Sequence, residues 1–245
     1  MSAPIRLVVI GAGGRMGRSL LNLLPEFPAL VLGAAVVAPG SKDLGQPGHG
    51  AVPMTADLPA ALSTAGLAID FSSAPAAAGN LQACVAAGVP LLLGTTGLAE
   101  DLQPRFELAA ARIPLLVAAN TSLAVNLLLE LARRTAQVLP ESFLIDIFEA
   151  HHKDKLDAPS GTALALGAAV EAGRGRACHV GYTVARGGDQ VGEHRVHFNG
   201  AGERLTLSHV AADRAVFARG ALAAGAWLAG QPPGRYRMQD LLGEK

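Results

Sequence analysis

The segment at residues 149–163, EAHHKDKLDAPSGTA, concentrates side chains that bind anions and transfer protons. An imidazole is the usual proton donor near neutral pH, and an ammonium group attracts carboxylates. The turn Pro-Ser-Gly-Thr at residues 159–162 is expected to begin a helix, whose first backbone amides and Ser160 and Thr162 hydroxyls would form an anion pocket. The segment therefore predicts a site that holds a carboxylate substrate and gives it a proton.

Residue spacing assigns different tasks to neighbouring side chains of this segment. Lys153 and Lys155 would lie on one side of an extended strand, whereas His151 and His152 would point to opposite sides, so that one histidine acts in chemistry while the other packs or binds. No cysteine or third ligand joins the histidines at zinc spacing, and we expect no metal here. Taken singly, each residue has a structural alternative, with Ser160 as a helix cap and Lys153 as a surface charge.

A second stretch, GAGGRMG, matches the dinucleotide-binding fingerprint G-x-G-x-x-G and follows an apolar run at residues 5–10. We expect Gly11 at the turn, Gly13 beside the pyrophosphate and Gly17 where the helix meets the strand. The helix N-terminus, at Gly14, Arg15 and Met16, would face the phosphates. A plain glycine turn is the alternative, but the strand before it and the helical pattern after it favour dinucleotide binding.

The acidic residue that normally binds the adenosine ribose about 20 positions further on is absent. Val37 and Ala38 stand there, and Ser41 and Lys42 follow. Without a carboxylate to repel a 2′-phosphate, the sequence favours NADPH or dual use over NADH alone. Lys42 as an ordinary loop residue is an equally good interpretation.

The composition excludes several classes of protein. Of the 245 residues, 50% are hydrophobic and 16% are charged, and the formal net charge is zero, which indicates a globular chain without an electrostatic attraction for nucleic acid or anionic membranes. Cys84 and Cys178 have neither disulfide-framework nor zinc-knuckle spacing and fit a reducing cytoplasm. No apolar run approaches the length of a membrane span, so we expect a cytoplasmic protein.

The first half alternates short apolar runs with Ala- and Leu-rich helical segments, which is typical of a Rossmann-type, doubly wound parallel sheet. The expected strands are residues 5–10, 30–37, 67–71, 89–93 and 114–118, and the clearest helices are 76–87 and 98–111.

After residue 122 the pattern changes to that of an α+β domain with a mixed or antiparallel sheet. We expect helices at residues 123–139 and 162–172, the latter stopped by Gly173, and strands at 143–149, 180–185, 190–198 and 203–209. A helix at 211–228 should return to the first domain. This gives a dinucleotide-binding domain at 1–122, completed by 211–245, and a substrate-binding and oligomerisation domain at 123–210.

The order of motifs resembles the dihydrodipicolinate reductase family. EAHHKDKLDAPSGTA is similar to that family's signature, and four further stretches match its landmarks along nearly the whole chain: IDFS at 69–72, GTTG at 94–97, AAN at 118–120 and RGGDQVGEH at 186–194. The resemblance implies an α/β oxidoreductase of diaminopimelate and lysine biosynthesis. Its members reduce 4-hydroxy-tetrahydrodipicolinate, a small cyclic dicarboxylate, to tetrahydrodipicolinate with NADH or NADPH and loss of water, as homotetramers.

The resemblance also implies residue roles. His151 would be the general acid and Lys155 its catalytic partner and a substrate ligand. Further substrate ligands would be His152, Ser160, Gly161, Thr162 and Thr96. Further cofactor contacts would come from Phe71, Ser72, Gly94, Thr96, Ala119, Asn120, Arg214 and Phe217.

Some positions depart from the family pattern. Val37 and Ala38 replace the ribose acid and its neighbouring arginine, Thr121 replaces an aromatic residue, and Ser73 replaces a basic one. The loop at 173–180 is also short. None of these departures touches the acid or the anion pocket.

Two alternatives stay open at this point. A nucleotide-sensing relative without catalysis would have no need of His151 and Lys155. The second alternative is another two-domain NAD(P)-dependent enzyme, such as an amino-acid dehydrogenase or a semialdehyde dehydrogenase. A semialdehyde dehydrogenase needs a nucleophilic cysteine at a strand end, whereas Cys84 falls within a helical segment. His194 and His197 would face opposite sides of a strand, which favours structural roles over a shared metal.

Overall fold

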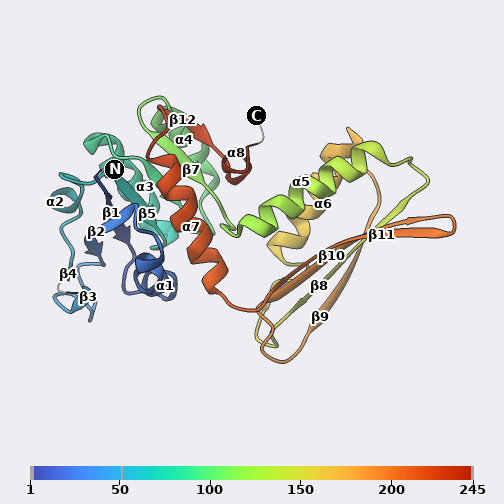
Figure 1. Ribbon diagram of the computed structural model, residues 1–245, viewed down its shortest axis with the longest axis horizontal. Helices are drawn as coiled ribbons and strands as arrows, with labels where there is room; N and C mark the ends of the chain where they lie inside the picture. The colour runs from blue at the N-terminus through green and yellow to red at the C-terminus, as the bar shows by residue number, and fades with distance from the viewer. Residues whose placement is uncertain (1–2, 51, 244–245) are drawn as a thin grey trace. The chain divides into compact units, whose positions relative to one another are not determined.

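The computed structural model describes residues 3–50 and 52–243, which fall into two compact units (Figure 1). The first unit comprises Met1–Ser122 and Phe217–Lys245, and the second comprises Leu123–Val216. The chain re-enters the first unit at Phe217, whereas the sequence pattern had placed that return at residue 211.

The first unit is built on an eight-stranded sheet, in the order β12-β7-β6-β5-β1-β2-β4-β3. Its neighbouring strands are parallel except for the antiparallel pair β3–β4. The bounds of the strands are β1 Ile5–Ile10, β2 Leu30–Val36, β3 Pro47–His49, β4 Val52–Thr55, β5 Leu67–Asp70, β6 Leu91–Leu93, β7 Pro114–Val117 and β12 Gly234–Tyr236.

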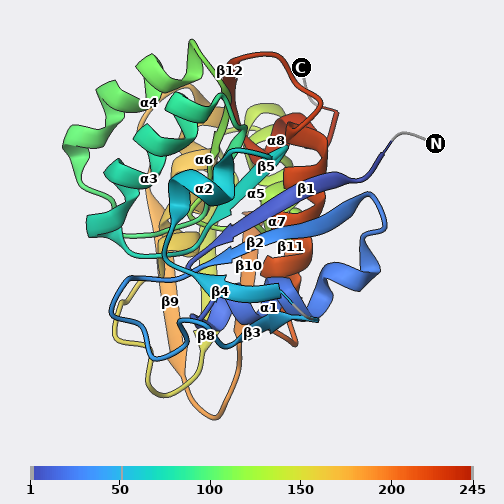
Figure 2. The ribbon, with the colours of Figure 1, turned by 90° about the vertical axis from the view of Figure 1, so that its left-hand side faces the viewer.

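Helices cover both faces of this sheet (Figure 2). One face packs against α3 and α4 through buried apolar side chains such as Leu81 and Phe106. On the other face α7 lies so close that a Cβ atom on Gly225 would be 2.9 Å from Leu67 and 3.0 Å from Ile69. The helices are α1 Arg15–Leu23, η1 Leu24–Glu26, α2 Leu58–Leu62, α3 Ala74–Ala87, η2 Glu100–Leu102, α4 Gln103–Ala110, α7 Ala215–Leu228 and α8 Met238–Leu241. The predicted doubly wound α/β fold is therefore confirmed.

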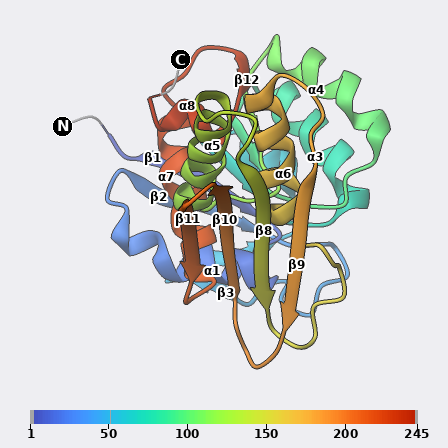
Figure 3. The same cartoon turned by 90° about the vertical axis from the view of Figure 1, so that its right-hand side faces the viewer.

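The second unit is a four-stranded mixed sheet in the order β11-β10-β8-β9, in which only β8 and β9 are parallel (Figure 3). Its elements are α5 Leu123–Val138, β8 Leu144–His151, α6 Gly161–Arg174, β9 Val180–Arg186, β10 Gly192–Gly200 and β11 Glu203–Ala211. Side chains of α5 and α6, including Leu128 and Leu166, form a buried core with Ile147 and Phe198 of the sheet. The predicted α+β unit with a mixed sheet is confirmed.

Several predicted boundaries were wrong for identifiable reasons. Helix α6 continues through Gly173, which is small because the Arg133 carbonyl of α5 approaches it, and ends at Gly175 with φ of 70°. Strand β11 extends to Ala211 because that residue pairs with Gly192, so α7 begins at Ala215 instead of residue 211. The short elements β3, β4, α2, β12 and α8 carry too few residues to show a period.

Among residues 3–50 and 52–243, no helix combines the length and the apolar character that crossing a membrane requires.

Candidate active site

Three loops meet at the carboxyl ends of the central strands of the first unit. Gly11, after β1, has φ of +83°, and a Cβ atom there would lie 2.6 Å from the Phe71 carbonyl oxygen and 2.8 Å from Ser72 Cα. A Cβ atom on Gly94, after β6, would overlap the Phe71 ring. Ligands of open α/β sheets bind at this edge. The structure thus brings Gly11, Phe71, Ser72 and Gly94 together, as the sequence predicted.

The glycine loop has the close backbone approach that a dinucleotide cradle needs. Gly14 is the N-cap of α1, with Arg15 and Met16 in its first turn. A Cβ atom on Gly17 would overlap the backbone of Gly11 and Ala12. Only glycine permits this contact of helix and strand, so the residues present fit a bound dinucleotide.

An acidic side chain that the sequence pattern did not reveal lies beside the cradle. The Asp43 carboxylate lies where a Cβ atom on Gly13 would be, next to Val37 at the end of β2. Arg18 donates to Asp43 Oδ1 at 2.9 Å and to the Gly13 carbonyl at 3.0 Å. The Asp43 amide donates to Ser41 Oγ at 3.2 Å, and Lys42 is exposed. The loop after β2 therefore supplies a carboxylate, and α1 supplies a guanidinium, near the end of β2 where the ribose acid is missing.

Asp70, buried at the end of β5, organises the neighbouring loop. Its carboxylate accepts hydrogen bonds from the Ser72 amide at 2.7 Å and from the Asn80 side chain at 2.9 Å. Asn80 also donates to Ser72 Oγ at 3.0 Å. This network holds the loop after β5 against the glycine cradle.

The remaining predicted contacts of the first unit lie after β6 and β7. Thr96 and Ala119 are exposed, and Asn120 accepts a hydrogen bond from the Ser122 amide at 2.9 Å. Thr121, which departs from the family pattern, is buried and donates to the Phe217 carbonyl at 2.7 Å. Thr121 thus ties the loop after β7 to the start of the returning helix.

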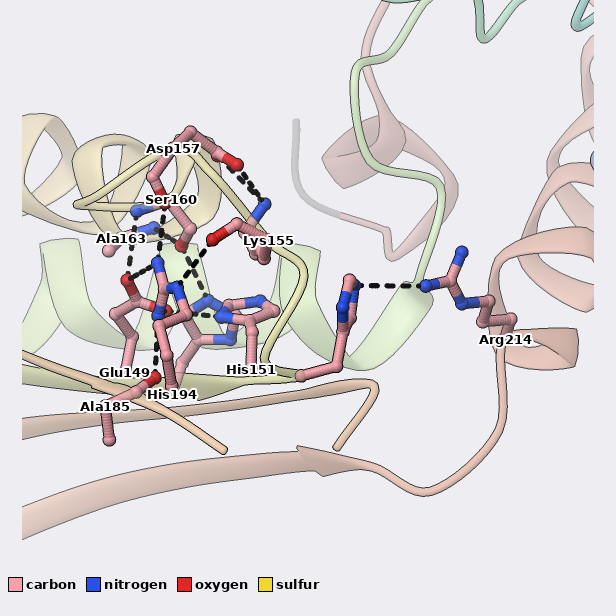
Figure 4. A network of polar contacts seen from close by, with 11 residues as sticks. Glu149, His151, Lys155, Asp157, Ser160, Ala163, Ala185, His194 and Arg214 are labelled. Carbon is pink, nitrogen blue, oxygen red and sulfur yellow. Dashed lines mark hydrogen bonds and ion pairs between the residues drawn. The ribbon is translucent and has the colours of Figure 1, made fainter. Parts of the chain in front are cut away.

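In the second unit, Glu149 and His151 extend the inward face of β8, which Ile145 and Ile147 begin (Figure 4). The two side chains are buried, and His151 Nδ1 is hydrogen-bonded to Glu149 Oε2. Burial lowers the pKa of His151, the Glu149 carboxylate raises it, and the charges of Lys155 and Arg186 lower it, with a net shift below the ordinary value.

Arg186 neutralises Glu149 from the adjacent strand β9, where it pairs with His151 in register. Its guanidinium donates to both carboxylate oxygens, at 2.7 Å and 3.0 Å. Burial raises the pKa of Glu149, but the hydrogen bonds from Arg186 and His151 hold it below the ordinary value. Arg186 also donates to the carbonyls of Lys155 and Asp157, at 3.3 Å and 2.6 Å, and so fixes the connection that carries the lysine.

Ser160 is the N-cap of α6, as predicted: its hydroxyl accepts from the Ala163 amide at 3.2 Å, and its own amide donates to Glu149 Oε1 at 3.2 Å. Asp157, just before this helix, accepts from Lys155 Nζ at 2.8 Å. That hydrogen bond is the main cause that lowers the pKa of Asp157, and the Gly161 backbone adds to it. A carboxylate is therefore already stabilised by the lysine and by the first turn of α6.

His194 of β10 joins this cluster, although sequence spacing pointed to a structural role. Its ring meets the His151 ring edge-on at 5.1 Å, and its Nε2 lies 3.2 Å from Ser160 Oγ. Burial, together with the charge of His151, lowers its pKa to about 4, so His194 is neutral near pH 7.

The cluster has residue types that bind metals, but its carboxylate is already engaged by other side chains. Possible ligand atoms of Glu149, His151 and His194 lie within 4.8 Å of one another, a grouping that spacing along the sequence did not reveal. Arg186 occupies both oxygens of Glu149, and His151 Nδ1 bonds one of them. A cation placed here would meet the guanidinium charge, so the geometry favours proton chemistry.

His152 follows the last residue of β8, and its Nε2 lies 3.3 Å from Arg214 Nη2. Arg214 belongs to the second unit, so the structure places it beside a predicted substrate ligand. Its role and that of Phe217 in cofactor binding remain predictions.

Sequence reasoning found His151, Lys155 and Ser160 but missed Glu149, Arg186 and His194. The only available signal was that Glu149 lies two residues before His151 on one strand face and that Arg186 opens the RGGD motif.

Both parts of the chain match models of one protein family. Residues 5–121 match the description "Dihydrodipicolinate reductase, N-terminus", and residues 124–242 match "Dihydrodipicolinate reductase, C-terminus". The chain belongs to the dihydrodipicolinate reductase family. The family resemblance of the motifs and the class of enzyme, an NAD(P)H-dependent oxidoreductase, are thereby confirmed.

Relatives in this family align over almost the full length. A 4-hydroxy-tetrahydrodipicolinate reductase of Thiobacillus denitrificans is 43% identical over 98% of this chain and 99% of its own. A reductase of the same name from Alkalilimnicola ehrlichii is 44% identical over 97% of this chain and 98% of its own length.

Solved structures agree in fold. The dipicolinate-bound dihydrodipicolinate reductase of Paenisporosarcina sp. TG-14 superposes with a TM-score of 0.84 at 21% identity, over 96% of this chain and 98% of that one. An aspartate semialdehyde dehydrogenase II of Vibrio cholerae superposes with a TM-score of 0.56 at 14% identity, over 98% of this chain and 99% of that one. The nucleophilic cysteine of such a dehydrogenase has no counterpart in Cys84, which lies buried within α3 with its pKa raised by burial to about 12.

Proposed function

We propose that this chain reduces 4-hydroxy-tetrahydrodipicolinate to tetrahydrodipicolinate with loss of water, in diaminopimelate and lysine biosynthesis, and that His151 delivers the proton. The observation that carries the assignment is the buried cluster around His151, next to a lysine and a capped helix N-terminus. The family, shared with reductases of this name at over 40% identity, supplies the substrate.

The second unit holds the substrate carboxylates in this proposal. Lys155 and the first turn of α6 already stabilise the Asp157 carboxylate, and a substrate carboxylate would replace it. His152, Ser160, Gly161 and Thr162 are the other proposed contacts of this unit, and Thr96 of the first unit is a further proposed substrate ligand. An ammonium and an imidazolium beside the ring stabilise the negative charge that builds up as the substrate is reduced.

The first unit holds the nicotinamide cofactor, which supplies the hydride when bound. The glycines of the cradle and the α1 N-terminus would bind the pyrophosphate. Phe71, Ser72, Gly94, Ala119 and Asn120 line the proposed nicotinamide side at the carboxyl edge of the sheet.

We further propose that the chain uses both NADPH and NADH. Arg18 suits a 2′-phosphate and Asp43 suits ribose hydroxyls, and the two are paired beside Gly13. The test is KM for each cofactor in the wild type, in Asp43→Asn and in Arg18→Gln. Arg18→Gln should raise KM mainly for NADPH and Asp43→Asn mainly for NADH. A clear preference of the wild type for either cofactor would refute dual use, and equal effects of each variant on both cofactors would refute the separate roles of Arg18 and Asp43.

The family resemblance supports a cytoplasmic homotetramer. The face of the β8–β11 sheet opposite α5 and α6 carries no described helix of its unit, which leaves it available for a second copy (Figure 3). Light scattering of the purified chain at micromolar concentration checks this, with four chains per particle expected and a monomer contradicting it.

The decisive experiment for the activity is a coupled assay. Aspartate semialdehyde, pyruvate and the preceding synthase supply the substrate, and the loss of NADH or NADPH absorbance reports turnover. We expect His151→Ala and Lys155→Ala each to lower kcat by on the order of 10² or more without loss of cofactor binding. Near-wild-type turnover in either variant would remove that residue's assignment, and no turnover of the wild type would favour a sensor or another dehydrogenase.

A further inference from the structure

We propose that Glu149 is the positioning residue of the acid His151: it fixes the ring with Nδ1 toward the carboxylate and leaves Nε2 as the atom that delivers the proton. This inference rests on the proposed function, because it assigns to His151 the role of proton donor. Neither the family match nor the motif signature states which atom or partner performs it.

The first argument is geometric. Glu149 and His151 are two residues apart on β8 and therefore share its inward face. His151 Nδ1 is hydrogen-bonded to Glu149 Oε2, and both side chains are buried. A hydrogen bond at one ring nitrogen sets which nitrogen carries the proton of the neutral imidazole. With Nδ1–H held by the carboxylate, the proton that leaves the imidazolium must come from Nε2.

The second argument is that the residue beside Nε2 has no side chain. A Cβ atom on Gly192 of β10 would lie 3.0 Å from His151 Nε2. Glycine at this position leaves space where any other residue would place a methyl group or more against the reactive nitrogen.

The third argument is that Glu149 is itself immobilised. Its two oxygens accept from Arg186, from His151 and from the Ser160 amide. One carboxylate thus links the acid to the cap of α6, the helix proposed to hold the substrate carboxylate. A residue that acts only in the core would not need four hydrogen bonds from three charged or polar partners.

The charged and titratable groups that face His151 define its pH behaviour. They are Glu149 on its own strand, Arg186 on β9, His194 on β10 and Lys155 on the connection; among these, only Glu149 raises the pKa of His151. Replacing Glu149 by a neutral amide removes this contribution. The pKa of His151 should then fall, and a general acid with a lower pKa loses its proton at lower pH.

The experiment uses the full chain and the coupled assay. We expect Glu149→Gln to lower kcat by on the order of 10-fold or more, with a smaller effect on substrate KM, and to move the alkaline loss of kcat to lower pH. Glu149→Asp, which keeps the charge, should restore the pH profile toward that of the wild type. Asp146→Asn is the matched control: it neutralises an exposed carboxylate on the same strand, bonded to Asn199 at 2.9 Å, and should leave kcat and the profile unchanged.

A double-mutant cycle separates positioning from a structural effect. Glu149→Gln should have no further effect on kcat when added to His151→Ala, because it acts through that ring. An equal loss in both backgrounds, or an unchanged pH profile, would overturn the inference while leaving His151 as the acid. Full activity of His151→Ala alone would instead overturn the proposed role of His151 and this inference with it.

A measurement on the wild type removes the dependence on variant folding. Nitrogen-15 NMR of labelled histidine, with the His151 signal identified by its loss in His151→Ala, reports the protonated nitrogen of the neutral ring. Nδ1–H is expected above the pKa of His151. Observation of the Nε2–H tautomer would refute the positioning role even if Glu149→Gln did not fold.

Discussion

Replacing Arg186 should show how much of the stability of the second unit depends on the neutralisation of the Glu149 charge. In Arg186→Met the buried carboxylate keeps His151 and the Ser160 amide but loses both guanidinium bonds, at 2.7 Å and 3.0 Å. Removing one partner of a buried ion pair costs about 3–5 kcal/mol, because the other charge stays buried without compensation. For a chain of this size each kcal/mol lowers Tm by roughly 2–4 °C, so a fall on the order of 10 °C is expected.

The double variant Arg186→Met with Glu149→Gln tests the cause. It removes the uncompensated charge but still lacks the Arg186 bonds to the carbonyls of Lys155 and Asp157, so it should lose only about 1–2 kcal/mol. The double variant is therefore expected to be more stable than the single one.

The pH dependence of the free energy of unfolding shows whether the charge of Glu149 stabilises or destabilises each protein. In the wild type the folded-state pKa of Glu149 is lowered, so its contribution is present above the unfolded pKa and is lost as pH falls through the folded pKa. In Arg186→Met burial dominates and the folded-state pKa rises above the unfolded value, so Glu149 destabilises the fold at neutral pH. The difference between the two proteins should therefore begin to narrow above about 4.3, the unfolded pKa of a glutamate, as Glu149 of the variant takes up a proton, and it should narrow further below that pH as the wild type loses its own contribution.

Urea unfolding followed by circular dichroism from pH 7 to pH 4 measures these free energies. Equal losses in the single and double variants at pH 7, or a difference from the wild type that is independent of pH, would show that Arg186 acts by packing and not as a counter-ion.

Three further outcomes are expected. Gly192→Ala should lower kcat with the fold intact, since its Cβ atom would lie 3.0 Å from His151 Nε2; a wild-type kcat would show that this nitrogen is not the reactive one. Gly173→Ala should destabilise the chain by about 1–3 kcal/mol, because its Cβ atom would overlap the Arg133 carbonyl. Gly79→Ala in α3 should instead stabilise the chain by about 0.5–1 kcal/mol, because nothing lies within 4 Å of the added Cβ atom. The urea midpoints of the two variants and the wild type measure both effects. Iodoacetamide at pH 8 should label Cys178 and leave Cys84 unmodified, because burial raises the pKa of Cys84 to about 12, and mass spectrometry of the native protein would show any contrary pattern.

The residues predicted correctly are those whose signal is local. The glycine cradle, the cap at Ser160 and the apolar strands each depend on neighbours a few positions away, and periodicity or a motif records them. Helix α6 shows the limit of that signal. Gly173 reads as a terminator, yet it is a close contact with α5, and Gly175 is the true C-cap.

Long-range pairings account for what the sequence did not predict. Glu149 meets Arg186 across 37 positions, and His194 meets Ser160 across 34, through strand register that no local pattern encodes. Asp43 was missed because its loop turns back over Gly13, so its distance along the chain from the end of β2 does not describe its place in space.

His194 affects how the Ser160 hydroxyl can form hydrogen bonds. A neutral imidazole carries one proton, and its Nε2 lies 3.2 Å from Ser160 Oγ, while its buried Nδ1 has no hydrogen-bond partner among the described residues. If Nε2 carries the proton, it donates to Ser160 Oγ, which already accepts from the Ala163 amide. Both acceptor positions of the hydroxyl are then filled, and its own proton must point elsewhere. That tautomer would leave a bare acceptor at Nδ1 and would make the Ser160 hydroxyl a donor, as the proposed contact with a substrate carboxylate at the α6 N-terminus requires.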